Sequence, residues 1–497
     1  MKTKSDNNIN RRNFIKTSAT AAIGMSLVPS FSGLGKKSGL MTRDFGRLNH
    51  EVTTFGLGGQ ASIQWTPEDV DPVAIILKTF KNKINYYDTS NLYGPSQSNY
   101  GKAFKQLSLI PGITGYNEKL RRSIFLTTKT HIRIAKGNLN AEGIRNWTNG
   151  AQDSHTIDDV KRSLSLMFGD GNGNYPEGAY LDMVLIHSLS RTNEVDILYE
   201  GLYNTDIKAE RIGALAALRD YRDGTNFTGL NPKEEKLIKH IGFSGHYDTS
   251  VMMDMIQRDR DNLLEGMLVA INANDKLNFN MQYNVIPVAK AKNMGIIAMK
   301  VFADGTMYTK DAVWSNNPSH VVRKVGSSEL PYRPLIEYSL TTPGICTAII
   351  GIGQISDNPE ECQLTKNINA AQIKPDGLSE GDRNSIEKMT SKVKDGKTNY
   401  FQLDKGGLTA VQNVKVNKID NQKIKLTWDT AYAGSNPIDY YEVWKNDQNI
   451  GKIKHTPQTN KIPFEFIDNV TSEKMRYYIT TVDTKGNKVE TEIKDAV

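Results

Sequence analysis

The chain has 497 residues and a formal net charge of +7 at pH 7. At a prior of about 150 residues per domain, this length indicates two or three units. Residues 1–37 contain seven lysines and arginines and one aspartate, which leaves a net charge of only +1 for the rest. A nearly neutral body lacks the basic footprint of a nucleic-acid-binding protein, and we expect no nucleic-acid partner.

The first residues have the pattern of an export signal. Arg11 and Arg12 are followed by Asn-Phe-Ile-Lys and then by an uncharged, mildly apolar stretch over residues 17–34. This pattern resembles a twin-arginine signal, which implies that a folded protein crosses the bacterial inner membrane to become periplasmic or secreted. We expect the signal over residues 1–35, with a basic tail as the alternative. No other stretch has the apolar length that a membrane span requires.

Short apolar runs alternate with helix-like stretches between residues 53 and 353. Continuous runs rich in Val, Ile and Leu are typical of strands buried on both faces of a parallel sheet. The eight runs are VTTFGLGG (52–59), INYYDTS (84–90), FLTTKT (125–130), MVLIHSL (183–189), IKHIGFSGH (238–246), MLVAINAND (267–275), GIIAMKVF (295–302) and CTAIIGIG (346–353). Eight strands, each followed by a helix, predict a (β/α)8 TIM barrel over residues 36–400.

The segments between these runs carry the 3.6-residue period of helices. Examples are residues 67–82, where Pro67 is placed to begin a helix, and residues 251–266. Glycine-rich insertions at 169–178 and 224–232 and a polar stretch at 304–330 interrupt the pattern. We expect these loops to enlarge the catalytic rim, and surface loops without substrate contact are an equal alternative.

After residue 400 the apolar period changes to two. The runs at 411–420, 422–428, 439–453 and 475–493 alternate inward and outward residues, with turn signals at 446–447 and 485–487. They predict a small all-β, immunoglobulin-like sandwich over residues 407–497. Trp428 and Tyr477 resemble the core tryptophan and corner tyrosine of a fibronectin type III domain. That resemblance leaves two roles open for this domain. It is either a module that contacts a glycan or a protein, or a spacer, and the spacer is slightly favoured.

Four polar residues stand where apolar runs end: Asp88 and Tyr93 in INYYDTSNLYG, Lys129 in FLTTKT and His187 in MVLIHSL. The C-terminal ends of barrel strands meet at one rim, so these side chains should converge. Carbonyl reduction requires a proton donor, and a free tyrosine with a pKa of about 10 is a poor acid at neutral pH. An ammonium held by a buried carboxylate would favour phenolate character and bring Tyr93 closer to its working range.

These motifs, in this order, give residues 41–370 a resemblance to the aldo-keto reductases. The resemblance implies that Tyr93 is the general acid, that Lys129 and Asp88 tune it, and that His187 orients the substrate. It also implies a nicotinamide cofactor, NAD or NADP. No metal site is predicted, and of the two cysteines, Cys346 lies in an apolar run, so inert thiols are favoured over a disulfide.

Cofactor positions on the nicotinamide side follow from the same resemblance. Ser244 occupies the place of a serine near the carboxamide, but Gly245 replaces the usual asparagine, and MLVAINAND has no glutamine where many members have one. Met299 stands where an aromatic commonly stacks on the nicotinamide. Backbone N–H groups around Val301 and Phe302 could bind the pyrophosphate whatever their side chains.

On the adenosine side, IIGIGQISDNPEECQLTKN resembles the turn and short helix after strand eight, with Gly353 in the turn. The resemblance places Gln363 and Asn367 at adenine-contacting positions. Asp357 falls where NADP-preferring members place a basic residue, and its carboxylate would repel a 2′-phosphate and favour NAD.

In the run Gly-Leu-Gly-Gly-Gln-Ala over residues 56–61, Gly56, Gly58 and Ala61 satisfy the spacing of a G-x-G-x-x-A dinucleotide fingerprint. Such a fingerprint should open a helix at once, but Trp65, Thr66 and Pro67 delay the helix. We therefore expect these glycines, with Gly59 on the cofactor side, at the end of the first barrel strand.

The sequence as a whole predicts an exported NAD(P)-dependent oxidoreductase that acts on a small carbonyl or alcohol substrate, with sugar derivatives as candidates. Because nicotinamide is not expected free outside the cytoplasm, the cofactor would be tightly bound. The alternative is a non-catalytic carbohydrate- or protein-binding protein on the same barrel. Gly245, Met299 and the absent glutamine favour that alternative, and the complete set of four polar residues opposes it.

Overall fold

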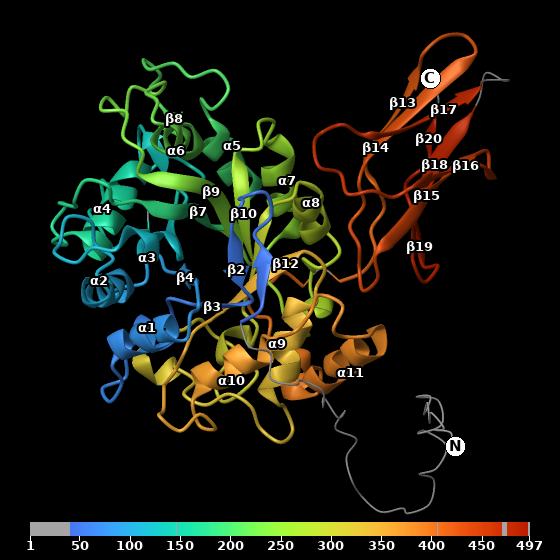
Figure 1. Ribbon diagram of the computed structural model, residues 1–497. Coiled ribbons are helices and arrows are strands. Elements are labelled where there is room, and N and C mark those ends of the chain that lie inside the picture. The colour runs from blue at the N-terminus through green and yellow to red at the C-terminus, as the bar shows by residue number, and fades with distance from the viewer. Residues whose placement is uncertain (1–39, 146, 405, 470–474, 496–497) are drawn as a thin grey trace, which may run out of the picture. The chain divides into compact units, whose positions relative to one another are not determined.

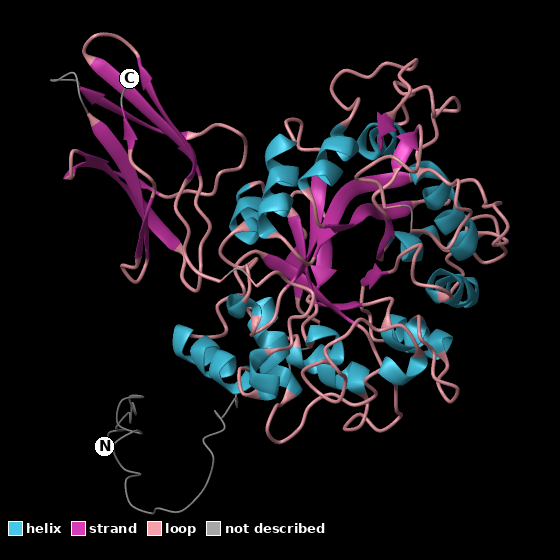
Figure 2. Ribbon diagram, turned by 180° about the vertical axis from the view of Figure 1, so that it is seen from behind, coloured by secondary structure: helices cyan, strands magenta, loops and turns pink. Residues whose placement is uncertain are grey.

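The computed structural model describes residues 40–145, 147–404, 406–469 and 475–495. The predicted export signal lies outside the described residues. Eight parallel strands close into a barrel in the order β10-β11-β12-β3-β4-β5-β7-β9 (Figures 1 and 2). The strands are β3 Phe55–Leu57, β4 Tyr86–Asp88, β5 Phe125–Thr130, β7 Leu181–Leu189, β9 Ile238–Gly245, β10 Leu264–Ala270, β11 Gly295–Met299 and β12 Ile345–Ile350. Each predicted run supplies one of them, so the predicted TIM barrel is confirmed.

Helices surround the barrel strands (Figure 2). They are α1 Pro72–Lys81, α2 Ser96–Gln106, α3 Glu118–Arg122, α4 Thr156–Phe168, α5 Thr192–Tyr199, α6 Ala214–Asp223, α7 Thr249–Arg258, α8 Val285–Ala291, α9 Tyr332–Leu340, α10 Gln363–Ala370 and α11 Glu380–Thr390. Short 3-10 turns occur at η2 Ala61–Ile63, η3 Asp275–Leu277, η4 Ala303–Gly305, η5 Pro318–His320 and η6 Val393–Gly396. No helix in the described ranges is long and apolar enough to cross a membrane.

The start of the first helix differs from the prediction. Helix α1 begins at Pro72 and not at Pro67, because the side chain of Asp71 accepts a hydrogen bond from the N–H of Val73 at 2.8 Å and caps the helix there. The helix predicted over 251–266 is also shorter in the structure. Helix α7 ends at Arg258, and residues 264–266 belong to β10.

Two short antiparallel pairs accompany the barrel: β1 Thr42–Asp44 with β2 Glu51–Thr53, and β6 Ile134–Lys136 with β8 Ile212–Gly213. All residues of β3, β4, β5, β11 and β12 are buried, as expected for strands covered on both faces. Cys346 and Cys362 are buried free thiols, which confirms that no disulfide joins them.

Only one of the three insertions reaches the catalytic rim. Residues 169–180 lead from α4 into β7 and residues 224–237 lead from α6 into β9, so both lie at the N-terminal ends of the strands. Residues 300–331 instead follow the C-terminal end of β11, where barrel chemistry gathers. An insertion that follows a helix therefore lies at the N-terminal end of the barrel strands, and an insertion that follows a strand lies at their C-terminal end.

The C-terminal residues form an all-β domain of two antiparallel sheets. One sheet pairs β13 Gln412–Lys418, β14 Lys423–Asp429 and β17 Phe464–Asn469. The other has the order β16-β15-β18-β19, with β20 on β18, over β15 Ile438–Lys445, β16 Gln448–Lys454, β18 Arg476–Asp483, β19 Lys488–Glu490 and β20 Lys494–Asp495. Asn446 and Asp447 take φ values of 47° and 66°, as a tight hairpin turn requires. The predicted runs do not include β17.

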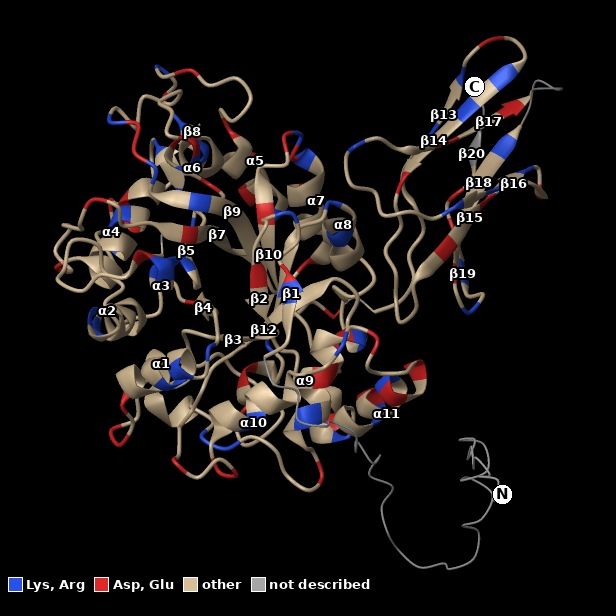
Figure 3. Cartoon of the chain, in the orientation of Figure 1, with Lys and Arg blue, Asp and Glu red and all other residues tan. Residues whose placement is uncertain are grey.

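Basic and acidic residues are interspersed over the helices of the barrel and the strands of the C-terminal domain (Figure 3). This distribution agrees with the near neutrality of the chain after residue 37.

Candidate active site

A buried ion pair lies at the C-terminal ends of two neighbouring barrel strands. Asp88 ends β4 and Lys129 lies in β5, and each is 1% exposed. The Lys129 Nζ donates to Asp88 Oδ1 at 2.6 Å, to Asp88 Oδ2 at 2.7 Å and to the carbonyl oxygen of Thr89 at 2.7 Å. An ammonium has three donors, so all of its hydrogen bonds are made within the protein.

The phenol and the imidazole join this pair. The Lys129 Nζ lies 4.8 Å from the centre of the Tyr93 ring. The rings of Tyr93 and His187 have centres 5.7 Å apart and meet at 78°. The Tyr93 hydroxyl makes no hydrogen bond with any described residue, and Tyr93 lines a cavity. The structure therefore brings all four predicted side chains together and leaves the phenolic hydroxyl free to meet a substrate.

The expected lowering of the Tyr93 pKa is not found. Burial raises the pKa of Tyr93 well above its ordinary value, and the negative charges of Asp88 and Asp304 raise it further. The Lys129 ammonium, 4.8 Å from the ring centre, favours the phenolate, but burial and the two carboxylates outweigh it. Tyr93 is therefore a protonated phenol at neutral pH.

His187 is a neutral imidazole. Burial lowers its pKa well below the ordinary value, and the charge of Lys129 lowers it further. Its Nδ1 lies 3.3 Å from the Ser90 Oγ, which fixes the ring and leaves Nε2 without a hydrogen-bond partner among the described residues.

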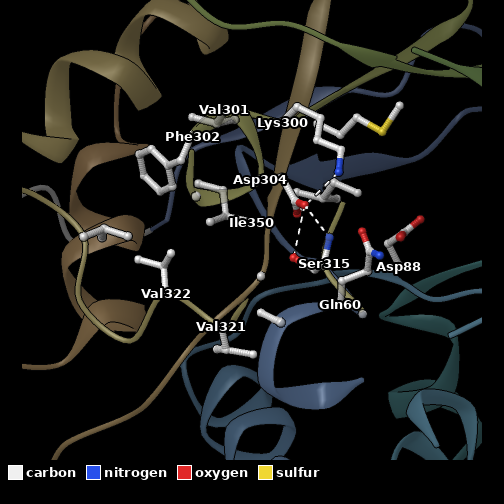
Figure 4. A pocket seen from close by; sticks show the side chains of 18 of the residues that line it. Gln60, Asp88, Lys300, Val301, Phe302, Asp304, Ser315, Val321, Val322 and Ile350 are labelled. Carbon is white, nitrogen blue, oxygen red and sulfur yellow. Dashed lines mark hydrogen bonds and ion pairs between the residues drawn. The ribbon is translucent and has the colours of Figure 1, made fainter. Parts of the chain in front are cut away.

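The cavity beside Tyr93 holds about 840 Å³ of space when its open mouth is included. Of the predicted site residues, the cavity is lined by Gly59, Asp88, Tyr93, Met299, Val301, Phe302 and Gln363. Figure 4 shows Asp88 and Gln60 on one side of this space and Val321 and Val322 on another.

The family model described as the aldo/keto reductase family matches residues 54–341, more than half of the chain. The chain belongs to the aldo/keto reductase family. The matched range contains the four polar residues and all strands of the barrel except the last.

Two solved structures are among those to which the chain is similar. A putative aldo-keto reductase from Pseudomonas aeruginosa is 21% identical, with 67% of this chain and 94% of that chain covered and a TM-score of 0.39. A thermostable aldo-keto reductase, solved with the inhibitor epalrestat, is 17% identical, with coverage of 70% and 100% and a TM-score of 0.43. No curated protein sequence matches the chain.

In this aldo/keto reductase, Ser244 does not line the cavity. It is fully buried, and its Oγ accepts a hydrogen bond from the Ser188 N–H at 2.9 Å. The missing side chain at Gly245 has a packing reason, because a Cβ there would lie 2.5 Å from the Sδ of Met252. An asparagine at this position would require Met252 to move.

The adenosine-side residues lie around the turn after β12. Gly353 donates its N–H to the Gln363 Oε1 at 2.8 Å. Asn367 is fully buried, and neither polar atom of its side chain has a partner among the described residues. An orphaned buried amide at a predicted adenine-contacting position, one turn of α10 after the cavity-lining Gln363, fits a bound nucleotide. Asp357 is exposed, and its Oδ1 lies 3.4 Å from the Lys78 Nζ.

A charged cluster on the loop after β11 is the part of the site that the sequence motifs missed. Asp304 is 3.4 Å from the Lys300 Nζ and 2.7 Å from the Lys310 Nζ, and it accepts hydrogen bonds from Ser315 and from the Tyr400 hydroxyl at 2.8 Å. Figure 4 shows Lys300 and Ser315 converging on Asp304 at the cavity wall. Only the polar character of residues 304–330 pointed to this region, without identifying the cluster.

The turn that carries the cluster is conformationally unusual. Lys300, Ala303 and Asp304 have φ values of 60°, 49° and 58°, a region that non-glycine residues seldom occupy. The two lysines lower the pKa of Asp304 despite its burial. The ion pairs therefore stabilise a turn that its backbone conformation disfavours.

Proposed function

We propose that this aldo/keto reductase is an exported enzyme that interconverts a carbonyl and an alcohol, sugar derivatives included, with NAD or NADP as redox partner. The observation that carries the proposal is the Tyr93 hydroxyl: it has no hydrogen-bond partner among the described residues and belongs to a residue that lines the cavity beside the buried Lys129–Asp88 pair. A purely structural tyrosine at this depth would be expected to satisfy its hydroxyl within the protein.

Bound NAD(P)H supplies the hydride, and the protein supplies the proton. Tyr93 stays protonated because its pKa is raised, and it donates from Oη to the carbonyl oxygen. Negative charge that then develops on the phenol is stabilised by the Lys129 ammonium, 4.8 Å from the ring centre. Neutral His187, held through Nδ1 by Ser90, orients the carbonyl through Nε2.

NAD is the cofactor that we favour, on the strength of the Asp357 carboxylate. A 2′-phosphate would be repelled by this group, although Lys78 at 3.4 Å reduces the repulsion. We further propose that the enzyme travels to the periplasm or is secreted by the twin-arginine route, on the strength of Arg11 and Arg12, with its cofactor already bound. For the C-terminal domain we propose a fibronectin type III-like spacer, with glycan or protein contact as the second role.

A binding protein on a reductase barrel is the second candidate. Two observations favour it. The Ser244 hydroxyl accepts a hydrogen bond from within the barrel, and Met252 occupies the space that a side chain at Gly245 would need. Both reduce the polar groups available to a nicotinamide carboxamide.

Tyr93→Phe tests the catalytic role directly. We expect kcat for aldehydes and keto-sugars to fall about 10²- to 10⁴-fold, the range typical of losing a general acid. The fold should persist because the hydroxyl makes no hydrogen bond within the described part of the chain. Turnover is measured by NADH and NADPH consumption, and the nicotinamide released on denaturing each purified protein is quantified by mass spectrometry.

Tyr87→Phe is the matched control. Tyr87 also belongs to β4, but its hydroxyl donates to the carbonyl of Ile84 at 2.9 Å and it does not line the cavity. This variant should keep parental turnover. Equal turnover of the parent and Tyr93→Phe would remove the proposed acid, and an inactive parent without bound nicotinamide would favour the binding protein.

A further inference from the structure

The barrel strand that carries the orienting imidazole is irregular at that imidazole. His187 and Ser188 of β7 together lie opposite the single residue Ser244 of β9, so β7 contains a β-bulge at this point. Ser188 has a φ of 63°, in the left-handed region that glycine occupies readily and other residues seldom do. The chain therefore holds a serine in a backbone conformation that its side chain disfavours, directly after the residue assigned to orient the substrate.

All polar groups of Ser188 are engaged by its neighbours. The N–H donates to the Ser244 Oγ at 2.9 Å, and the Oγ lies 3.4 Å from the His246 Nδ1. The carbonyl oxygen accepts hydrogen bonds from the Ser190 Oγ at 2.8 Å and from the Arg145 Nη2. A disfavoured backbone conformation persists only where its surroundings over-determine it, and such residues cluster at active sites. The contacts to Ser188 are therefore candidates for a functional role.

Arg145 is the charged member of this set, and the structure fixes it on three sides. Its own N–H donates to the Ile132 carbonyl at 2.9 Å, and its carbonyl accepts from the His131 Nδ1 at 2.9 Å. Its Nε lies 2.8 Å from the Oε1 of Glu194, a fully buried carboxylate. A hydrogen bond from a charged donor is about twice as strong as one between neutral groups. Arg145 is therefore the contact that contributes most to holding the Ser188 carbonyl.

The bulge determines where the imidazole points. With Ser188 in this conformation, the rings of His187 and Tyr93 meet with their centres 5.7 Å apart. If Ser188 relaxed to a negative φ and the bulge flattened, the alternation of side chains along β7 would shift by one residue, and His187 would turn toward the other face of the strand. Neither Arg145 nor Ser188 lines the cavity, so any effect of theirs on the reaction passes through His187.

We propose that Arg145 is a positioning residue that acts through the Ser188 carbonyl to hold the bulge and aim His187 at the substrate. The inference rests on the proposed function, because it takes His187 as the group that orients the carbonyl. It extends the site to the segment between β6 and α4, which no sequence motif identified. It also accounts for Ser244, whose hydroxyl is engaged by the Ser188 N–H and holds the same bulge.

Arg145→Gln tests this role, with propanal and D-xylose as substrates and NADH or NADPH as the cofactor. We expect kcat to fall about 10²-fold, the loss typical of a misplaced group in an active site. The Kd for the cofactor, measured by quenching of protein fluorescence, should equal the parental value because Arg145 does not line the cavity.

Ser188→Gly provides the readout that a structural role would not move. Glycine takes a positive φ without steric cost, so the bulge no longer depends on the Arg145 contact. Added to Arg145→Gln, this substitution should restore kcat about tenfold, as expected from the cost of a left-handed conformation for other residues. If Arg145 only stabilised the fold, Ser188→Gly would restore nothing.

Arg121→Gln is the matched control, because Arg121 also pairs with a buried carboxylate, and that carboxylate belongs to β7 itself. The Arg121 Nη1 lies 2.8 Å from the Oδ2 of Asp182, near the start of the strand and at the other end of the barrel. This variant should lower the unfolding temperature and keep the parental kcat.

Parental kcat in Arg145→Gln, or a loss that Ser188→Gly does not reduce, would overturn the positioning role and leave the proposed function standing. If the parent reduces neither aldehyde, the proposed function fails, and crystal structures of the parent and Arg145→Gln decide the inference. A negative φ at Ser188 with the His187 ring turned away from Tyr93 supports it, and an unchanged bulge overturns it. If Arg145→Gln does not fold, Arg145→Lys replaces it in every measurement, since lysine keeps a charge beside Glu194 but lacks the guanidinium fork.

Discussion

Single residues of the site show how burial sets the protonation states that the chemistry needs. Asp88 and Lys129 exchange their contact with water for three short hydrogen bonds, while Tyr93 and His187 are kept in their neutral forms. Breaking a buried pair by removing one partner is costly, so Lys129 and Asp88 hold the site's geometry as well as its charge. A neutral donor and a neutral orienter beside one paired cation suit a reaction in which negative charge appears on oxygen.

These protonation states predict an unusual pH profile. The raised pKa of Tyr93 keeps the phenol protonated past pH 10, and the lowered pKa of His187 keeps the imidazole neutral below pH 6.5. We therefore expect kcat/KM to stay flat from about pH 6 to about pH 10, with no limb at the ordinary histidine pKa. Initial rates at subsaturating substrate measure the profile. A limb centred near pH 6.5 that disappears in His187→Gln would contradict the burial argument.

At the scale of elements, the barrel strands were predictable and the loops that complete the site were not. Strands buried on both faces need continuous apolar residues, so each leaves a visible run and a defined C-terminal end, which is where Asp88, Lys129 and His187 lie. The cluster around Asp304 depends on positive φ angles and on Tyr400, nearly a hundred residues away. Neither leaves a periodic signal. The start of α1 was missed because two prolines suit a first turn and only the Asp71 cap decides between them.

The turn η3 between β10 and α8 carries a second buried acid whose effect on stability can be measured. Burial raises the pKa of Asp275 to about 7, although the Gln402 amide donates to it at 2.9 Å. An acid whose pKa is higher in the folded than in the unfolded state binds its proton more tightly when folded. Its contribution to the free energy of unfolding therefore declines as pH rises from about 4 to about 7 and is constant above that.

Asp275→Asn should remove this dependence. We expect the variant to match the parent near pH 4 and to exceed its free energy of unfolding at pH 8 by up to about 4 kcal/mol, the value of a shift of about three pKa units. Urea unfolding at the two pH values measures the difference. Asp376→Asn, at an exposed position, is the control and should change neither value. A variant less stable than the parent at pH 8 would show that Asp275 is ionised and well solvated by its hydrogen bonds.

At the scale of the whole molecule, the buried apolar residues of the described chain gather in two hydrophobic cores. One gathers buried residues from Phe45 to Phe401 around the barrel, and the other gathers buried residues from Val411 to Ile479 in the C-terminal domain. Trp428 is the largest side chain of the second core, fully buried and stacked on Phe464 with ring centres 6.1 Å apart. Because each core excludes water by itself, each can support its own unfolding transition.

Trp428→Ala should therefore lower the stability of the C-terminal domain alone. The substitution should destabilise the C-terminal domain by about 3–5 kcal/mol, as expected for truncating a buried tryptophan, and leave the barrel transition in place. NADH or NADPH at 100 times its Kd should raise only the barrel transition, by about 2.7 kcal/mol. Differential scanning calorimetry with and without cofactor separates the unfolding transitions of the barrel and of the C-terminal domain. As a control, Leu185→Ala, in the buried strand β7, should lower the temperature of the transition that the cofactor raises. A single transition that Trp428→Ala lowers and cofactor raises would mean that the sandwich and the reductase barrel unfold as one unit, and that the domain after residue 407 contributes to the stability of the active site.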